Sequence, residues 1–191
     1  AKIIFSSSLY GKKDNWNTLI NYKKCYPKTL WCANPNRSDL LYLKNNLSVL
    51  KSIDCFFLNL EEASMLSGLP YTQEKAIFQF IDKHIHGICI ISQGSKGLTA
   101  SDNKFIYHCD AYKHIKLVDT TGAGDALASG FSLMYQKTKD IEYSLKFGLA
   151  NASNCIEKIG GNTNLLTPTI FNNRIWKKYF NKLKIKKEKI W

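Results

Sequence analysis

The sequence predicts an α/β fold built around a mainly parallel sheet, and three observations lead to it. Strand-like apolar stretches alternate along the chain with helix-like stretches of about 10–15 residues, as in βαβ units. The composition, 45% hydrophobic and 13% aromatic over 191 residues, suffices for a sizeable core. Four polar or glycine-rich segments also follow predicted strands, namely "NPNR", "LNLEE", "SQGSKG" and "DTTGAGD". Because parallel strands end at one edge of a sheet, these segments should meet where ligands of such sheets bind.

Strands are predicted where short apolar runs are bounded by turn residues. In the first half of the chain they cover residues 2–8, 29–35, 54–60 and 87–92. The second of these is closed by the turn Asn34-Pro35-Asn36. Further on, residues 97–109 predict a hairpin with Asp102-Asn103 at its turn, and residues 114–119 predict one more strand.

Helices are predicted between these strands from the spacing of apolar residues. They cover residues 14–26, 38–53, 61–68, 72–85, 124–135, 140–160 and 169–183. The expected caps are Asp14 for the first helix, Ser38 or Asp39 for the second, and Gly68 at the end of the third. Side chains on the last helix (Phe171, Ile175, Tyr179 and Leu183) should face the core, and the basic residues 184–189 should form a solvated tail.

The formal net charge of +12 raises the question of nucleic acid binding. Of the 27 basic residues, only Arg37 and Arg174 are arginines, whereas specific base and phosphate contacts favour arginine. We therefore prefer a coding bias toward lysine as the explanation, with nucleic acid not expected as a partner. A lysine-coated face would still attract polyanions weakly.

The six cysteines are dispersed and form no C-x-x-C pair, which favours reduced, buried thiols in a cytoplasmic, reducing compartment. His84 and His86 do not have the spacing of a zinc site.

No apolar run approaches the ~18 residues that a membrane span needs, so no membrane partner is expected. The chain begins at Ala1 with neither Met nor a leader-like segment, which we interpret as a fragment, a processed product or an incomplete chain.

The segment "KLVDTTGAGDALASGF" (116–131) carries the most informative motif. Gly122 and Gly124 allow a tight turn at a predicted helix start, where backbone N–H groups attract anions. Asp125 stands where a Walker A loop needs Lys, and Leu127 stands where a dinucleotide fingerprint needs Gly, so both of those loops are excluded. Two interpretations of Asp125 remain open: an ordinary first-turn aspartate favoured by the helix dipole, or a general base beside a transferring phosphoryl group.

The motif "DTTGAGDALASGF" resembles the signature of the ribokinase-like (PfkB-type) family of sugar and nucleoside kinases. Other segments match the family in the same order: "LWCANPN", "FFLNLEEASMLSG", "ICIISQGSKGLTA" and "GLANASNCIEKIGG". The resemblance implies a ribokinase-like three-layer α/β/α sandwich with a mostly parallel sheet. It also implies that residues 1–191 are the carboxy-terminal portion of a single kinase domain, without the family's amino-terminal part and lid, which carry most acceptor-binding groups.

The resemblance also implies roles for individual residues. Asp125 would be the catalytic base, and Gly122, Ala123 and Gly124 would form the anion hole. Asp119 and the Thr121 carbonyl would hold a monovalent cation, expected to be K⁺.

The remaining implied roles concern ATP and Mg²⁺. Asn59 and Glu62 would organise Mg²⁺ indirectly, through water. Further residues would border ATP: Ser92, Gly94 and Gly97 at the phosphates, and Asn151 or Asn154 at the adenosine. Without the resemblance, Asn59 and Glu62 are interpreted equally well as a strand-end turn and a helix cap. Gly94 and Gly97 would then be hairpin turn residues. We interpret Arg37 as a surface residue rather than as a phosphate ligand.

Two functions follow. The first is an ATP-dependent kinase that phosphorylates a hydroxyl of a sugar or nucleoside, which the intact Asp125 favours. The alternative is a non-catalytic, kinase-like structural subunit of a larger assembly that contains RNA, which the basic charge favours. A homodimer is left open.

Overall fold

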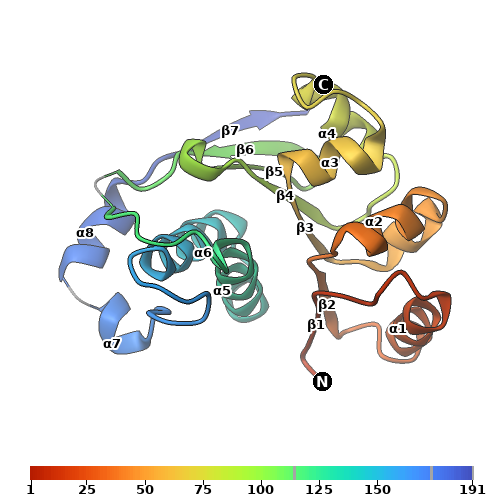
Figure 1. Ribbon diagram of the computed structural model, residues 1–191, viewed down its shortest axis with the longest axis horizontal. Coiled ribbons are helices and arrows are strands. Elements are labelled where there is room, and N and C mark those ends of the chain that lie inside the picture. Colours follow the sequence, from red (N-terminus) through yellow and green to blue (C-terminus); the bar gives the residue numbers. More distant parts are fainter. Residues whose placement is uncertain (114, 173, 191) are drawn as a thin grey trace. The chain divides into compact units, whose positions relative to one another are not determined.

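The computed structural model describes residues 1–113, 115–172 and 174–190 (Figure 1). Its contacts divide the chain into two compact units. The first unit contains residues 1–93, 99–106 and those from 188 onward. The second contains residues 94–98 and 107–187.

The strands form one seven-stranded, partly parallel sheet in the order β1 to β7. The strands are β1 (Ile3–Ser6), β2 (Leu30–Ala33), β3 (Cys55–Asn59), β4 (Ile88–Ser92), β5 (Leu98–Ser101), β6 (Phe105–Cys109) and β7 (Ile185–Lys189). The first four strands pair in parallel and in sequence order, as expected for successive βαβ units. The predicted hairpin is also present, with Asn103 at its turn in the left-handed conformation (φ 66°). The α/β prediction is therefore confirmed.

In the first unit, helices and a 3₁₀ segment follow β1, β2 and β3. They are α1 (Lys13–Cys25), α2 (Arg37–Lys44), η1 (Leu47–Ser52), α3 (Leu60–Ser67) and α4 (Glu74–Asp82). Trp16 of α1 lies at the centre of their core, with its ring centroid 6.0 Å from that of Trp31 on β2. The same core contains Phe56 of β3 and Ile91 of β4, so one face of the parallel strands is buried beneath these helices.

Two details of the predicted helices are wrong in this unit. Asp14 does not cap α1, because the N-cap position is Lys12 and Asp14 lies in the first turn. The predicted helix 38–53 is divided into α2 and η1. The side-chain amides of Asn45 and Asn46 donate to the carbonyls of Leu41 and Tyr42, and such local bonds compete with a continuous helical ladder.

The cap of α2 is Asn36 rather than Ser38 or Asp39, and Asp39 completes a capping box with it. The Asp39 side chain is buried and also accepts N–H bonds from Leu9 (2.9 Å) and Gly11 (2.8 Å). A single carboxylate thus closes a helix end and fixes the loop after β1. Gly68 ends α3 in the left-handed conformation, as predicted.

The second unit is built on α5 (Ala123–Thr138) and α6 (Ile141–Cys155), followed by α7 (Pro168–Phe171) and α8 (Arg174–Lys182). Only Lys139 and Asp140 connect α5 to α6, so the two helices run antiparallel. Small residues let them approach closely: a Cβ on Gly148 would lie 2.8 Å from the Leu127 carbonyl oxygen. A Cβ on Gly130 would lie 3.1 Å from Cβ of Asn151.

The predicted strand 114–119 is wrong over its described residues, 115–119, and His114 lies outside them. The N–H groups of Val118 and Asp119 both donate to the carbonyl oxygen of Ile156 at the end of α6, instead of pairing with a strand. Leu117 is 65% exposed, so the apolar character of this segment does not reflect a buried strand.

The carboxy-terminal prediction is also partly wrong. The expected helix 140–160 ends at Cys155, and the expected helix 169–183 is divided into α7 and α8. The basic tail is β7, an exposed strand at the edge of the sheet, where its lysines stay solvated. The expected core residues are partly confirmed. Phe171 packs on Phe147 and Phe180, and Leu183 is buried, whereas the Ile175 side chain lies outside the described residues.

The six cysteines are free thiols. Five of them are buried as predicted, whereas Cys25 is exposed, so the prediction of buried thiols is wrong for that residue. Among the described residues, no helix is both long enough and apolar enough to cross a membrane.

Asp82, the last residue of α4, provides a test of the first unit's stability. Its Oδ2 accepts from Ser101 Oγ (2.7 Å), and its Oδ1 is buried without a hydrogen-bond partner. Burial, with a smaller contribution from Asp102, raises the pKa of Asp82 from 3.8 to about 6.

Because the folded pKa lies above the unfolded one, stability should fall as pH rises from about 4 through 6 and stay lower above that range. We expect Asp82→Asn to raise the free energy of unfolding at pH 7.5 by roughly 1–2 kcal/mol, allowing for partial solvent screening. The gain should shrink by more than half at pH 4. Urea unfolding at both pH values measures this, with the exposed Asp14→Asn as control. A gain that is equal at both pH values would contradict the role of ionisation.

Candidate phosphate-binding loop

The segment 119–125 forms a turn that leads directly into α5. Gly122 is the N-cap residue, in the left-handed conformation (φ 75°), and no side chain caps the helix there. The N–H of Ala123 donates to Thr120 O (3.2 Å), and the helical ladder begins with Ala126 N–H donating to Gly122 O (2.8 Å). The N–H groups of Gly124 and Asp125 therefore precede the ladder, at the positive end of the helix dipole.

Glycine is required at position 122 for a second reason. A Cβ there would lie 2.1 Å from the carbonyl oxygen of Gly161 and 2.5 Å from its Cα. The backbone of the loop thus rests directly on the backbone of the segment that follows α6. Residue 122 can carry no side chain unless these two segments separate.

The loop is accessible at its far end. A Cβ at Gly124 would meet no atom within 4 Å, and Gly124 and Asp125 are both exposed. Gly122 and Ala123 are half-buried. The open space at Gly124 leaves room for another molecule to approach the first N–H groups of the helix.

Asp119 anchors the start of the loop through both of its carboxylate oxygens. Oδ1 accepts the N–H of Thr121 (2.9 Å), and Oδ2 accepts the N–H of Gly160 (3.0 Å). These backbone bonds, first from Gly160 and then from Thr121, lower the pKa of Asp119 below its usual value. Asp119 is therefore an anion at neutral pH, and it joins the loop to the segment that follows α6.

Cys155, the last residue of α6, is buried against the same backbone. Its Sγ lies 3.4 Å from Gly161 O and 3.9 Å from Thr121 O. Burial, then the carboxylates of Asp119 and Asp125, raise the pKa of Cys155, so the thiol stays neutral. It serves as a small side chain that fits between two backbone segments.

The two asparagines predicted near adenosine, Asn151 and Asn154, lie on α6 and are both buried. The Asn151 amide donates to Ala126 O (2.8 Å), and its carbonyl accepts the N–H of Leu166 (2.8 Å). Asn154 exchanges two hydrogen bonds with the main chain and side chain of Asn164, and the Asn164 amide donates to Asn154 O at 2.6 Å. Their amides thus hold the surroundings of the loop together.

In the first unit, Asn59 and Glu62 lie at the junction of β3 and α3. They form a capping box: Asn59 Oδ1 accepts the Glu62 N–H (2.8 Å), and Glu62 Oε2 accepts the Asn59 N–H (2.7 Å). Ser92 ends β4 directly opposite Asn59 in the parallel register. The structure therefore brings these three residues together at the carboxyl ends of neighbouring strands, and the helix-cap interpretation of Asn59 and Glu62 describes their contacts correctly.

Gly94 and Gly97 flank the 3₁₀ turn η2 (Gly94–Lys96) that leads into β5. Both have positive φ (58° and 96°), and Gly97 N–H donates to Gly94 O (3.0 Å). A Cβ on Gly97 would lie 2.0 Å from Cys109 O, whereas a Cβ on Gly94 would meet nothing within 4 Å. Gly97 is thus needed for packing, and Gly94 lies in the open.

The predicted site residues therefore form two sets, one in each unit. Asn59, Glu62 and Ser92 belong to the first unit, and the loop with its asparagines belongs to the second. Sequence reasoning missed Gly160, Gly161 and Asn164, which support the loop from the other side. The adjacent glycines in "EKIGGNTN" were the available signal. In the described part of the chain, no three His, Cys, Asp or Glu side chains group closely enough to hold a metal ion.

Comparisons with known proteins agree with this geometry. The model of the "pfkB family carbohydrate kinase" matches residues 8–168. A nucleoside kinase of Methanocaldococcus jannaschii is 31% identical over 148 residues, which cover 76% of this chain and 47% of the relative. A cytidine kinase of Thermococcus kodakarensis is 28% identical over 157 residues, which cover 80% of this chain and 50% of the relative. The chain thus spans about half the length of these curated relatives.

Solved structures lead to the same fold. The nucleoside kinase of Methanocaldococcus jannaschii, an archaeal member of the ribokinase family, superimposes with a TM-score of 0.70 and 26% identity. This match covers 95% of the present chain and 55% of the other. A ribokinase of Thermotoga maritima shares the fold at a TM-score of 0.67 and 20% identity, over 95% of this chain and 57% of that one. With the family model matching most of its length, the chain belongs to the PfkB family of carbohydrate kinases.

Proposed function

We propose that residues 1–191 form the carboxy-terminal portion of a single PfkB-type kinase domain with a three-layer α/β/α arrangement. This portion carries the phosphate site of an ATP-dependent phosphotransferase. The acceptor is a hydroxyl group of a sugar or nucleoside. The family match and the two nucleoside-phosphorylating relatives support this substrate class.

One observation carries the proposal: α5 starts without a side-chain cap, next to open space, with a carboxylate in its first turn. An uncapped helix N-terminus presents N–H groups and a partial positive charge to an anion. Asp125 lies in the first turn, where the helix dipole also favours an ordinary aspartate, so its position agrees with both interpretations and the family match favours the catalytic one. Gly122 holds the N-cap position, so no side chain caps the start of α5, and the space beside Gly124 is open.

The proposed reaction uses these groups together. The Asp125 carboxylate accepts the proton of the acceptor hydroxyl while the hydroxyl oxygen forms a bond to the γ-phosphorus of ATP. The bond between that phosphorus and the bridging oxygen breaks, and its electron pair leaves with ADP. Of the anion hole predicted at residues 122–124, the N–H groups of Gly122 and Gly124 would stabilise the negative charge on the transferring phosphoryl oxygens. The Ala123 N–H already donates to Thr120 O and supports the turn instead.

Mg²⁺ fits this chain only as an ion bound through water and phosphate. Asn59 and Glu62 each use one side-chain oxygen in the capping box. In the part of the chain that the structure describes, they belong to no group of three or more His, Cys, Asp or Glu side chains that could hold a metal ion. Mg²⁺ commonly keeps several waters, so an indirect role for these two residues remains consistent with its chemistry. When bound, Mg²⁺ would neutralise charge on the ATP phosphates.

A monovalent cation fits beside the loop. The Asp119 carboxylate is held as an anion by the Gly160 and Thr121 N–H groups, and the Thr121 carbonyl lies in the same turn. Both are hard oxygen donors of the kind that alkali and alkaline-earth cations prefer. We propose that these two groups hold K⁺, whose charge would add to the positive potential at the start of α5.

The remaining predicted residues border ATP in this proposal. Ser92 and Gly94 are accessible enough to line its phosphates, and Gly97 maintains the turn that positions Gly94. Asn151 and Asn154 would shape the adenosine side, mainly by holding backbone in place, because their amides are already engaged.

The first prediction concerns Asp125. Asp125→Asn removes the proton acceptor and keeps the side-chain volume, so kcat should fall by several orders of magnitude while ATP affinity stays within about tenfold. The measurement is ADP release by the natural polypeptide that contains these residues, with ATP, Mg²⁺, K⁺ and a panel of sugars and nucleosides. Asp14→Asn, an exposed first-turn aspartate of α1, is the matched control and should leave turnover unchanged.

Wild-type turnover in Asp125→Asn would remove Asp125 from its role. Absence of ADP with every acceptor, together with salt-sensitive retention on RNA, would replace the kinase by the structural-subunit alternative.

The second prediction concerns the cation. Asp119→Asn removes the negative charge, so the K⁺ concentration needed for half-maximal activity should rise at least tenfold. Turnover at saturating K⁺ should recover in part, because Asn can still accept one of the two backbone N–H bonds. Activity that is independent of K⁺ in the wild type would contradict this site and would leave the role of Asp125 unaffected.

A further inference from the structure

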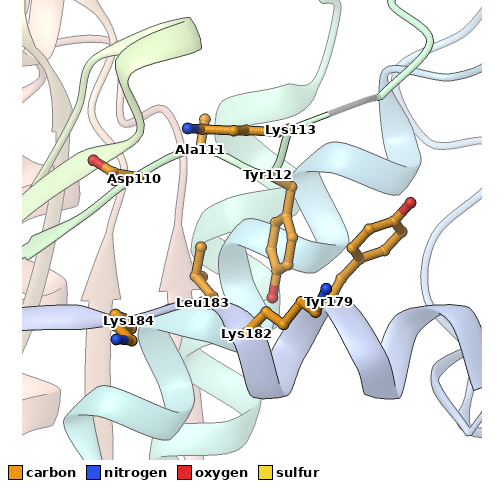
Figure 2. A pocket seen from close by; sticks show the side chains of 8 residues that line it. All are labelled: Asp110, Ala111, Tyr112, Lys113, Tyr179, Lys182, Leu183 and Lys184. Carbon is orange, nitrogen blue, oxygen red and sulfur yellow. The ribbon is translucent and has the colours of Figure 1, made fainter.

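A second candidate site lies within the second unit, away from the loop. It is a cavity of about 400 Å³, within the usual size range of small-molecule sites (Figure 2). Two segments line it: residues 110–113, which follow β6, and residues 179 and 182–184 at the end of α8. None of these residues has a part in the proposed phosphoryl transfer.

One wall of the cavity is aromatic and held in place. Tyr112 is buried, and its hydroxyl donates to Lys146 O on α6 (3.3 Å). Its ring meets the rings of Trp176 and Tyr179 edge to face, at centroid distances of 5.6 and 6.4 Å. Figure 2 shows the Tyr112 ring pointing toward α8 and the Tyr179 ring rising from α8 beside it. Such a fixed aromatic surface suits a planar ring, which it can contact at little cost in conformational entropy.

The polar lining is strongly basic. Lys113, Lys182 and Lys184 line the cavity, against a single carboxylate, that of Asp110 (Figure 2). Within the described residues, none of the three ammonium groups forms an ion pair. Three positive charges around one cavity repel each other, and a bound polyanion would relieve that repulsion.

The cavity is separate from the phosphate-binding loop along α6. Tyr112 is attached to this helix at Lys146, whereas the loop is attached at its end, through Cys155 and Ile156. Cys155 lies nine positions after Lys146 on α6, which corresponds to about 13 Å along the helix axis. A single phosphate group cannot bridge that distance.

We propose that this cavity is a second anion site, which binds a small phosphorylated molecule with a planar ring. The lysines would bind the phosphate group, and the Tyr112–Tyr179 wall would contact the ring. This site goes beyond the proposed phosphoryl transfer and does not depend on it.

Pyridoxal 5′-phosphate is a suitable probe, since it carries both a ring and a phosphate group. Its aldehyde condenses with a lysine ε-amine to an imine and water, and borohydride then supplies hydride that fixes the product as a secondary amine. After labelling of the full chain with about one equivalent of probe, peptide mass mapping gives the modified lysines. We expect Lys113, Lys182 and Lys184 to be labelled at least fivefold more than Lys177 and Lys178. Excess pyrophosphate should remove the preference.

Two double variants make the test specific. Lys182→Gln with Lys184→Gln should lower labelling of Lys113 at least fivefold, because two phosphate-binding charges are lost. Lys177→Gln with Lys178→Gln removes the same charge from the exposed surface of α8 and should leave Lys113 labelling unchanged. Circular dichroism of both variants checks that they fold equally.

Three outcomes would overturn the proposal. The first is even labelling of all five lysines, the second is an equal loss of Lys113 labelling in both variants, and the third is no protection by pyrophosphate. Protection of the three lysines by Mg-ATP, at the concentrations that support phosphoryl transfer, would also overturn the proposal. The cavity would then be part of the ATP site and not a separate, second anion site. Kinase activity is measured separately, so failure of this site leaves the proposed function intact.

Discussion

The buried amide of Asn151 is the interaction on which the arrangement of the second unit depends. Its NH₂ group donates to Ala126 O in the first turn of α5, and its carbonyl accepts the N–H of Leu166 beyond α6. One side chain thus fixes three segments that are distant in sequence. Because a buried amide left without partners costs about 1–3 kcal/mol, a shift of the loop that breaks these bonds is disfavoured by about that amount. Gly130 and Gly148 make this contact possible by letting α5 and α6 approach closely.

The loop before α5 is fixed by contacts at its start and is open to solvent at its other end. Asp119, Gly122 and Cys155 bind it to the segment around Gly160 and Gly161, whereas Gly124 adjoins open space and Asp125 is exposed. Groups that stabilise developing charge act best when they are already in position, since no reorganisation is then needed during the reaction. The structure supplies that rigidity through backbone contacts. The proposed function requires a clear approach to the first N–H groups of α5, and accordingly no side chain caps that end of the helix.

Periodicity and turn chemistry predicted the four parallel strands, the hairpin and the start of α5 from the sequence, because each depends on local spacing. The segment 115–119 shows the limit of that reasoning: "IKLVD" has the composition of a strand, yet its N–H groups bind the end of α6. The strand β7 (Ile185–Lys189) shows the opposite case, because its basic sequence does not have the composition of a strand. It forms one nevertheless at the edge of the sheet, where its lysines are exposed to water. The motif indicated Gly122 and Asp125. The adjacent Gly160 and Gly161 were visible in the sequence, but nothing in their local pattern shows that they contact the loop.

The backbone contact between Gly122 and Gly161 has a consequence for protein engineering. The turn before α5 does not keep its shape independently, because the backbone of Gly161, about forty positions downstream, packs directly against Gly122. Transplanting "DTTGAGD" into another scaffold would therefore fail unless that scaffold also places the Gly160-Gly161 pair against the residue equivalent to Gly122. For the same reason, sequence surveys that score the two glycine clusters jointly should separate intact members of the family from decayed copies better than either cluster does alone.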